Sequence, residues 1–188
     1  KVHFAYATNG ETIIEIDLVA GTERTVPGYP SPDELMRRYR ERTGLTNDNA
    51  VERLLTPDHP SEGKDPRYYQ TIANNRTVEA IVSGKTRALI VMATGTGKTS
   101  LAFQICWKLW STRWNRAGRP LRPKILYLAH LDVLVADPIR RDFAPFGEAI
   151  TRVDGRAGTA HDIYFALYHA IAHPDRSPAL YREWSPDF

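Results

Sequence analysis

The stretch Ala88-Leu-Ile-Val-Met92 runs directly into Ala93-Thr-Gly-Thr-Gly-Lys-Thr99, and Ser100-Leu-Ala-Phe-Gln-Ile105 follows. An apolar strand, a glycine-rich turn ending in Lys-Thr and the start of a helix together indicate a phosphate-binding loop. Glycines let backbone N–H groups approach phosphate oxygens, and the N-terminus of the helix adds positive potential. We expect Lys98 to reach the β- and γ-phosphates of ATP and Thr99 to coordinate the accompanying Mg²⁺. The loop residues predicted to bind the nucleotide are Thr94, Gly95, Thr96, Gly97, Lys98 and Thr99, and the catalytic candidates are Lys98 and Thr99.

A further candidate for nucleotide binding lies upstream, in Arg67-Tyr-Tyr-Gln70. The Gln70 amide can donate to and accept from the adenine edge at once, which would select adenine over guanine. This segment resembles the Q motif of helicases. The loop itself, with Met92 where the strict pattern has glycine, is similar to the variant found in superfamily 2 helicases and translocases. A plain structural alternative for the upstream segment is a helix start whose tyrosines pack at the domain edge.

Helices and strands alternate on both sides of the loop. The patterns predict helices over residues 68–82, 99–112, 133–143 and 162–171, and strands over residues 88–92, 125–128 and 148–153. Buried parallel strands that alternate with helices form α/β sheets. The predicted fold class is therefore α/β, with a partial RecA-like parallel sheet that carries the phosphate-binding loop.

The first 66 residues follow a different pattern. Asn9-Gly10 is a strong hairpin signal between apolar-rich strands at residues 2–8 and 12–18, and a third strand is expected at residues 23–26. Ser31-Pro-Asp-Glu then predicts the start of a helix that ends near Arg42. The expected organisation is antiparallel strands over residues 1–26, a linker with a helix over 27–66, and the α/β part over 67–188.

Composition limits the classes of protein that fit. The 188 residues include one cysteine, Cys106, which cannot form an internal disulfide, and no apolar run long enough to span a bilayer. A cytoplasmic protein with no membrane partner is expected. Residues 1–66 carry net charge −4 and residues 67–188 carry +7, which favours a polyanionic partner for the second part.

One stretch concentrates positive charge. Lys108 to Lys124 holds six Lys or Arg residues and no acidic residue, interleaved with tryptophans. Cations beside aromatic faces suit contact with nucleic acid. The alternative is that Trp107 and Trp110, which share a helical face with Phe103, pack in the interior and leave the arginines on a solvated loop.

Several segments together resemble the motor (restriction) subunit of type I restriction-modification enzymes, which is HsdR-like and related to superfamily 2 helicases. They are Phe4-Ala-Tyr-Ala-Thr-Asn-Gly10, Arg67-Tyr-Tyr-Gln70, the phosphate loop, Ala102-Phe-Gln-Ile-Cys-Trp-Lys-Leu109, Phe143-Ala-Pro-Phe-Gly147 and Asp162-Ile-Tyr-Phe-Ala-Leu-Tyr168. The resemblance implies an ATP-dependent, type I site-specific deoxyribonuclease that joins a nuclease domain to two RecA-like motor lobes. It also implies double-stranded DNA and the methylation and specificity subunits as partners. By this comparison, residues 1–26 resemble the last strands of the nuclease domain and residues 67–188 the N-terminal part of the first motor lobe.

The family's acidic motifs are not found in this sequence. The one Asp-Glu pair, Asp33-Glu34, lies in the first turn of a predicted helix rather than after an apolar strand, where a Walker B motif is needed. Glu15 and Asp17 lack the lysine of a nuclease Glu-x-Lys motif. The resemblance thus predicts a fragment that binds ATP and is inactive alone. Two alternatives remain open at this point, a stand-alone ATP-binding module and an RNA helicase fragment.

Overall fold

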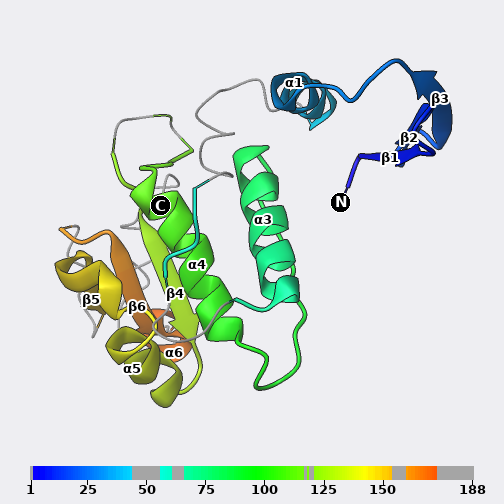
Figure 1. Cartoon of the computed structure of the whole chain (residues 1–188). Helices are drawn as coiled ribbons and strands as arrows, with labels where there is room; N and C mark the ends of the chain where they lie inside the picture. Colours follow the sequence, from blue (N-terminus) through cyan, green and yellow to red (C-terminus); the bar gives the residue numbers. More distant parts are fainter. Residues whose placement is uncertain are drawn as a thin grey trace. The chain divides into compact units, whose positions relative to one another are not determined.

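The computed structural model describes residues 2–43, 56–60, 66–116, 118, 121–153 and 160–172 (Figure 1). The chain forms two compact units, Lys1–Val51 and Glu52–Phe188. Within the described residues, the first unit holds an antiparallel sheet and the second a parallel sheet, each of three strands. The predicted α/β class is confirmed.

The first unit opens with a three-stranded meander. Strands β1 (Phe4–Thr8), β2 (Ile13–Asp17) and β3 (Thr22–Val26) pair in the order β1-β2-β3. The predicted turn at Asn9-Gly10 is present, because Asn9 Oδ1 accepts hydrogen bonds from the backbone N–H groups of Glu11 and Thr12. Gly10 has a φ of 95°, which residues with a side chain rarely adopt.

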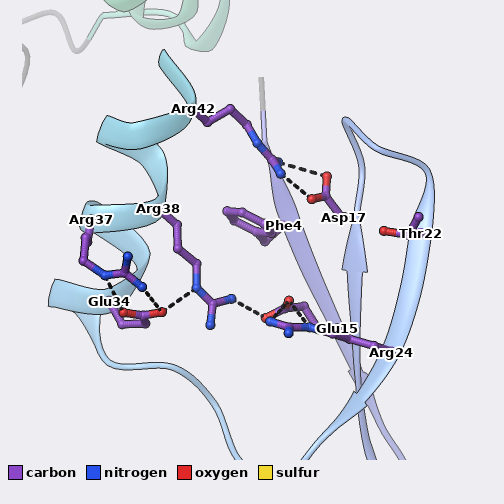
Figure 2. Close-up of a pocket in the computed structure, with 9 residues that line it drawn as sticks. All are labelled: Phe4, Glu15, Asp17, Thr22, Arg24, Glu34, Arg37, Arg38 and Arg42. Atoms are coloured by element: carbon purple, nitrogen blue, oxygen red, sulfur yellow. Dashed lines mark hydrogen bonds and ion pairs between the residues drawn. The ribbon is translucent and has the colours of Figure 1, made fainter. Parts of the chain in front are cut away.

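Helix α1 (Pro32–Thr43) belongs to the same unit and is tied to β2 by ion pairs (Figure 2). Arg38 lies 2.9 Å from Glu15, and Arg42 lies 2.5 Å from Asp17. The Arg42 guanidinium also covers the Phe4 ring, 4.8 Å from its centroid. The hydrogen bonds from Arg42 and from the N–H groups of Ala20 and Val19 lower the pKa of Asp17. One face of α1 is therefore held by charged side chains rather than by a buried apolar stripe.

The second unit alternates helices with parallel strands. It contains α3 (Tyr68–Val82), α4 (Lys98–Ser111), β4 (Ile125–Ala129), α5 (Val133–Arg140), η1 (Ala144–Ala149), β5 (Ile150–Arg152), β6 (Ile163–Leu167) and α6 (Tyr168–Ala172). The strands pair in the order β4-β6-β5. Helices α3 and α4 lie side by side (Figure 1).

Strand β6 is buried on both of its faces. Ile163 and Phe165 pack on one side in a cluster with Phe103, Val135, Phe143 and Phe146. Tyr164 and Ala166 pack on the other side with Val153 and Ile171. A central parallel strand needs this two-sided cover, which explains its continuous apolar sequence.

That continuous run made one prediction wrong. Residues 162–171 were expected to form a helix, but Ile163–Leu167 is strand β6 and only Tyr168–Ala172 is helical. An apolar run of five residues has no period that separates a buried strand from a buried helix.

The strand predicted before the phosphate loop is also not observed as one. Residues 88–92 make no strand pairing in the structure, and the side chains of Leu89 and Val91 are 90% and 85% exposed. A parallel strand exists only through ladder bonds to a neighbour, and β4, β5 and β6 pair with one another instead. The remaining predicted elements of this unit occur within a few residues of their expected bounds, with β5 and α5 shorter than expected.

Candidate nucleotide-binding site

The predicted phosphate loop forms a tight turn at the start of α4. Gly95 and Gly97 have φ angles of 74° and 89°, so both positions need the conformational freedom of glycine. The Thr96 hydroxyl donates to the carbonyl of Ala93 at 2.6 Å, which closes the turn. The exposed Lys98 ammonium donates to the carbonyls of Met92 and Ala93 at 3.2 and 3.0 Å. The loop thus curls around its own lysine.

Helix α3 brings Gln70 onto this loop. The Gln70 side-chain Nε2 donates to the carbonyl of Thr96 at 2.9 Å, and its Oε1 accepts from the backbone N–H of Arg67. The Tyr69 hydroxyl reaches the same Thr96 carbonyl at 3.3 Å. A Cβ atom on Gly97 would lie 2.2 Å from Gln70 Nε2, so this packing requires glycine there as well. The structure therefore brings together Gln70 and the loop residues, although they are separated by some 25 positions in the sequence.

Thr99 lies where α4 meets the sheet. Burial raises the pKa of the Tyr127 phenol, and the hydroxyl of Thr99 opposes that shift. The Tyr127 ring is fixed by stacking on Phe165, with centroids 4.7 Å apart. Thr99 is therefore held against β4 beside a rigid aromatic ring.

The donor set at the start of α4 fits a phosphate group with a divalent cation. A lysine ammonium, a helix N-terminus and two glycines allow phosphate oxygens to approach the backbone, and Thr99 adds an oxygen ligand of the type that Mg²⁺ accepts. Elsewhere, no group of three or more His, Cys, Asp or Glu side chains that could hold a metal occurs among the described residues.

Three cations of the basic stretch predicted as a possible nucleic-acid contact, Lys108, Arg122 and Lys124, pair with carboxylates in the structure. Lys108 is 4% exposed and lies on α4 beside Asp58, 3.2 Å away. Arg122 stacks over Trp110 with its guanidinium carbon 3.7 Å from the ring centroid, and it pairs with Asp162. Asp162 also accepts a hydrogen bond from Trp110 and faces Lys124 at 3.4 Å. The alternative interpretation, that the tryptophans of this stretch pack inward, fits Trp107 and Trp110, which both contact the main core cluster.

Asp162 is the residue that sequence reasoning missed here. It stands at the N-terminal end of β6 and organises Trp110, Arg122 and Lys124 around one carboxylate. The available signal was an acidic residue directly before an apolar strand, but its partners lie 38 to 52 positions away.

The loop after β4 carries an ion pair of its own. Asp132 and Arg152 lie 2.5 Å apart, which joins this loop to the end of β5. Next to it, Leu131 is exposed. His130 and Asp132 are thus polar residues of this loop.

A cavity in the first unit carries no comparable chemistry. Its lining includes four arginines, Arg24, Arg37, Arg38 and Arg42 (Figure 2). Each of them pairs with a carboxylate, from Glu15, Asp17, Glu34 or Glu41. Glu15 and Asp17 are therefore structural ion-pair partners.

Among the described helices, none has the length and apolar character needed to cross a bilayer.

Comparison with known proteins identifies the family. Residues 63–183 match the family described as "Type III restriction enzyme, res subunit". The whole chain is 40% identical to the endonuclease subunit of the type I restriction enzyme EcoAI from Escherichia coli and spans 23% of that protein. A solved fragment described as an HsdR subunit of a type I restriction enzyme from Vibrio vulnificus YJ016 is 44% identical. It superimposes with a TM-score of 0.77 over 97% of this chain and 31% of its own. The chain therefore belongs to the HsdR-like endonuclease subunits of type I restriction enzymes.

Proposed function

We propose that this chain supplies the ATP-binding part of an ATP-dependent DNA translocase and endonuclease subunit. The observation that carries the proposal is the contact between Gln70 and the carbonyl of Thr96, which joins the two predicted nucleotide motifs in one place. A glycine-rich turn without a nucleotide role would not account for a second predicted motif packed against it. Membership of the HsdR-like family supports the same proposal.

The proposed organisation follows the family. Residues 1–26 are the C-terminal strands of an endonuclease-like domain, residues 27–66 are a linker that includes α1, and residues 67–188 are the N-terminal part of a RecA-like lobe. The proposed linker is held at α1 by the ion pairs of Arg38 and Arg42 with β2.

In this proposal, the loop residues bind and orient the triphosphate. Lys98 exchanges the carbonyls of Met92 and Ala93 for phosphate oxygens, because an anion is a stronger partner for an ammonium than a neutral carbonyl. The backbone at Thr94, Gly95, Thr96 and Gly97 wraps the phosphates in this proposal, and the Gln70 amide contacts the adenine. Thr99 would hold Mg²⁺, which neutralises charge on the β- and γ-phosphates when bound.

The proposed partners are double-stranded DNA and the methylation and specificity subunits of a restriction complex, in the cytoplasm. Because no Walker B pair occurs in the sequence, the isolated 188-residue chain is proposed to bind ATP without appreciable hydrolysis. Nucleotide binding by the chain, and not turnover, is therefore the property to measure.

The test is the affinity of the chain for a fluorescent ATP analogue in the presence of Mg²⁺. Lys98→Ala removes a charge-assisted contact that contributes roughly 1.5–3 kcal/mol, so the Kd should rise about 10- to 150-fold. Lys85→Ala, a change at an exposed lysine before the loop, is the matched control and should leave the Kd unchanged. Equal affinities for wild type and Lys98→Ala would refute the proposed site.

Thr99→Ala tests the metal role separately. If Thr99 holds Mg²⁺, its loss should weaken binding when Mg²⁺ is present and have little effect when the ion is chelated. An equal loss in both conditions would assign Thr99 a packing role against Tyr127 instead.

A further inference from the structure

The dipeptide Asp58-His59 is bound between α3 and α4 by side chains that recognise it from several sides. The backbone N–H of His59 donates to Gln104 Oε1 at 2.8 Å, and Gln104 Nε2 donates back to the His59 carbonyl at 2.9 Å. Gln104 is only 6% exposed. This paired contact satisfies both backbone groups of His59 and fixes the course of the chain at that residue.

The Asp58 carboxylate joins the two helices. It accepts a hydrogen bond from Asn74 Nδ2 on α3 at 2.7 Å and lies 3.2 Å from the Lys108 ammonium on α4. Lys108 also donates to Asn75 Oδ1 at 3.0 Å. Because a buried ammonium is costly without a counter-charge, Asp58 is the group that makes this position of Lys108 favourable.

The ring of His59 adds an aromatic contact to α4. It meets Trp107 edge-on at 4.3 Å and Phe103 at 5.4 Å between ring centroids. Asp58-His59 is thus held by a carboxylate, a backbone pair and a ring, which makes the attachment specific to these two residues.

Both helices that hold Asp58 also begin at the candidate nucleotide site. Gln70 lies in the first turn of α3, one turn before Asn74, and Lys98 opens α4. A shift of α3 along α4 would move Gln70 off the Thr96 carbonyl. In its present position the Gln70 amide packs so closely on residue 97 that only a glycine, which has no side chain, fits there.

We propose that Asp58 is a positioning residue for the nucleotide site. By bridging Asn74 and Lys108 it sets α3 against α4 and so holds Gln70 on the phosphate loop. This inference rests on the proposed function, because it concerns the same nucleotide. Linkage is reciprocal, so a nucleotide that contacts both Gln70 and the loop also strengthens the attachment of Asp58-His59.

The test compares the 188-residue chain with Asp58→Asn and with the double variant Asp58→Asn/Lys108→Met. The single change removes the charge that faces Lys108 with almost no change in shape. The double change also removes the buried charge, so that loss of the bridge is separated from loss of stability. Asp137→Asn, which breaks the exposed ion pair with Arg140 on α5, is the matched control.

The measurements are the Kd values of fluorescent ATP and GTP analogues with Mg²⁺, and urea unfolding followed by tryptophan fluorescence. The preference for the ATP analogue should fall roughly fivefold or more in both Asp58 variants, and nucleotide should slow hydrogen exchange at the His59 N–H in wild type. The control should keep the wild-type preference.

The outcomes separate the two proposals. If the double variant is as stable as wild type and keeps its preference for the ATP analogue, Asp58 is a structural residue only and the positioning role is overturned. If wild type binds neither analogue, the nucleotide site itself is refuted, and the positioning role with it. The positioning role is also overturned if Asp58→Asn loses both stability and preference for the ATP analogue while the double variant keeps that preference.

Discussion

The carboxylate of Glu15 offers the sharpest test of how the first unit is held together. Glu15 is 4% exposed and accepts hydrogen bonds from Tyr6 at 2.8 Å, Arg24 at 2.8 Å and Arg38 at 2.9 Å. Burial alone raises the pKa of Glu15, but these three hydrogen bonds outweigh burial and lower it below its ordinary value of 4.5. The change to test is Glu15→Gln, which keeps the shape and removes the charge.

The expected loss follows from the three donors. Glutamine retains one acceptor oxygen but turns an NH₂ group toward the remaining donors. Each charge-assisted hydrogen bond contributes roughly 1.5–3 kcal/mol. The bond from Arg24 contributes less, because its mostly exposed guanidinium is hydrated by water when the carboxylate is lost. We expect the free energy of unfolding of this unit to fall by about 2–3 kcal/mol at pH 7.

The assay can follow each unit separately. The four tryptophans of the chain are at positions 107, 110, 114 and 184, so tryptophan fluorescence reports the second unit. Hydrogen exchange of the backbone N–H groups of β2 reports the first unit and should become roughly 30- to 150-fold faster in Glu15→Gln. Glu23→Gln on the exposed strand β3 is the control and should change exchange little.

The pH dependence supplies the refuting result. Because the pKa of Glu15 is lower in the folded chain, its contribution is present above the unfolded value of about 4.5. That contribution is lost as the pH falls through the folded pKa. The difference between wild type and Glu15→Gln should therefore shrink below pH 4.5. A difference that is unchanged in acid, or absent at pH 7, would show that the carboxylate charge does not stabilise the unit.

Two further predictions concern the second unit. Gly97→Ala and Gly84→Ala each place a side chain at a positive φ and should each cost about 1–2 kcal/mol in urea unfolding, but only Gly97→Ala brings a Cβ within 2.2 Å of Gln70. Only that variant should weaken binding of the ATP analogue, and equal binding losses in both variants would refute the packing argument. Burial raises the pKa of Cys106 to about 12, so the native thiol should resist alkylation at pH 8 and react once urea unfolds the chain. Rapid alkylation of the native protein would contradict this.

Local signals predicted most of the elements. The structure contains the predicted helix at residues 68–82 and the predicted hairpin at Asn9-Gly10. Helix caps, turns and hydrophobic periodicity involve residues that are neighbours in the sequence, so they can be recognised there. The strand at residues 163–167 was mistaken for helix, because a fully buried strand has no polar face to reveal its period. Residues 88–92 have strand composition, but pairing depends on a neighbour that composition does not specify.

The candidate site was predictable only in part for a related reason. The phosphate loop is contiguous, so its residues could be assigned from the sequence, and Gln70 could be added from a short motif. Lys108 was grouped with a basic stretch, whereas it is buried against Asp58, 50 positions upstream. The partner of a buried lysine cannot be identified from the residues around it in the sequence. Gln104 and Lys108 do share one helical face, four residues apart, and two polar residues at core spacing were the available warning.

The proposed linker uses charge at both of its described attachments, but in two different environments. In the pairs with β2 the side chains of Arg38 and Arg42 are 24% and 30% exposed, whereas the side chain of Lys108 beside Asp58 is 5% exposed. Salt weakens interactions between exposed charges and acts far less on buried pairs. The Arg42–Asp17 pair should therefore weaken more than the Lys108–Asp58 pair as ionic strength rises. The attachment beside the proposed nucleotide site is thus the one that depends less on ionic strength.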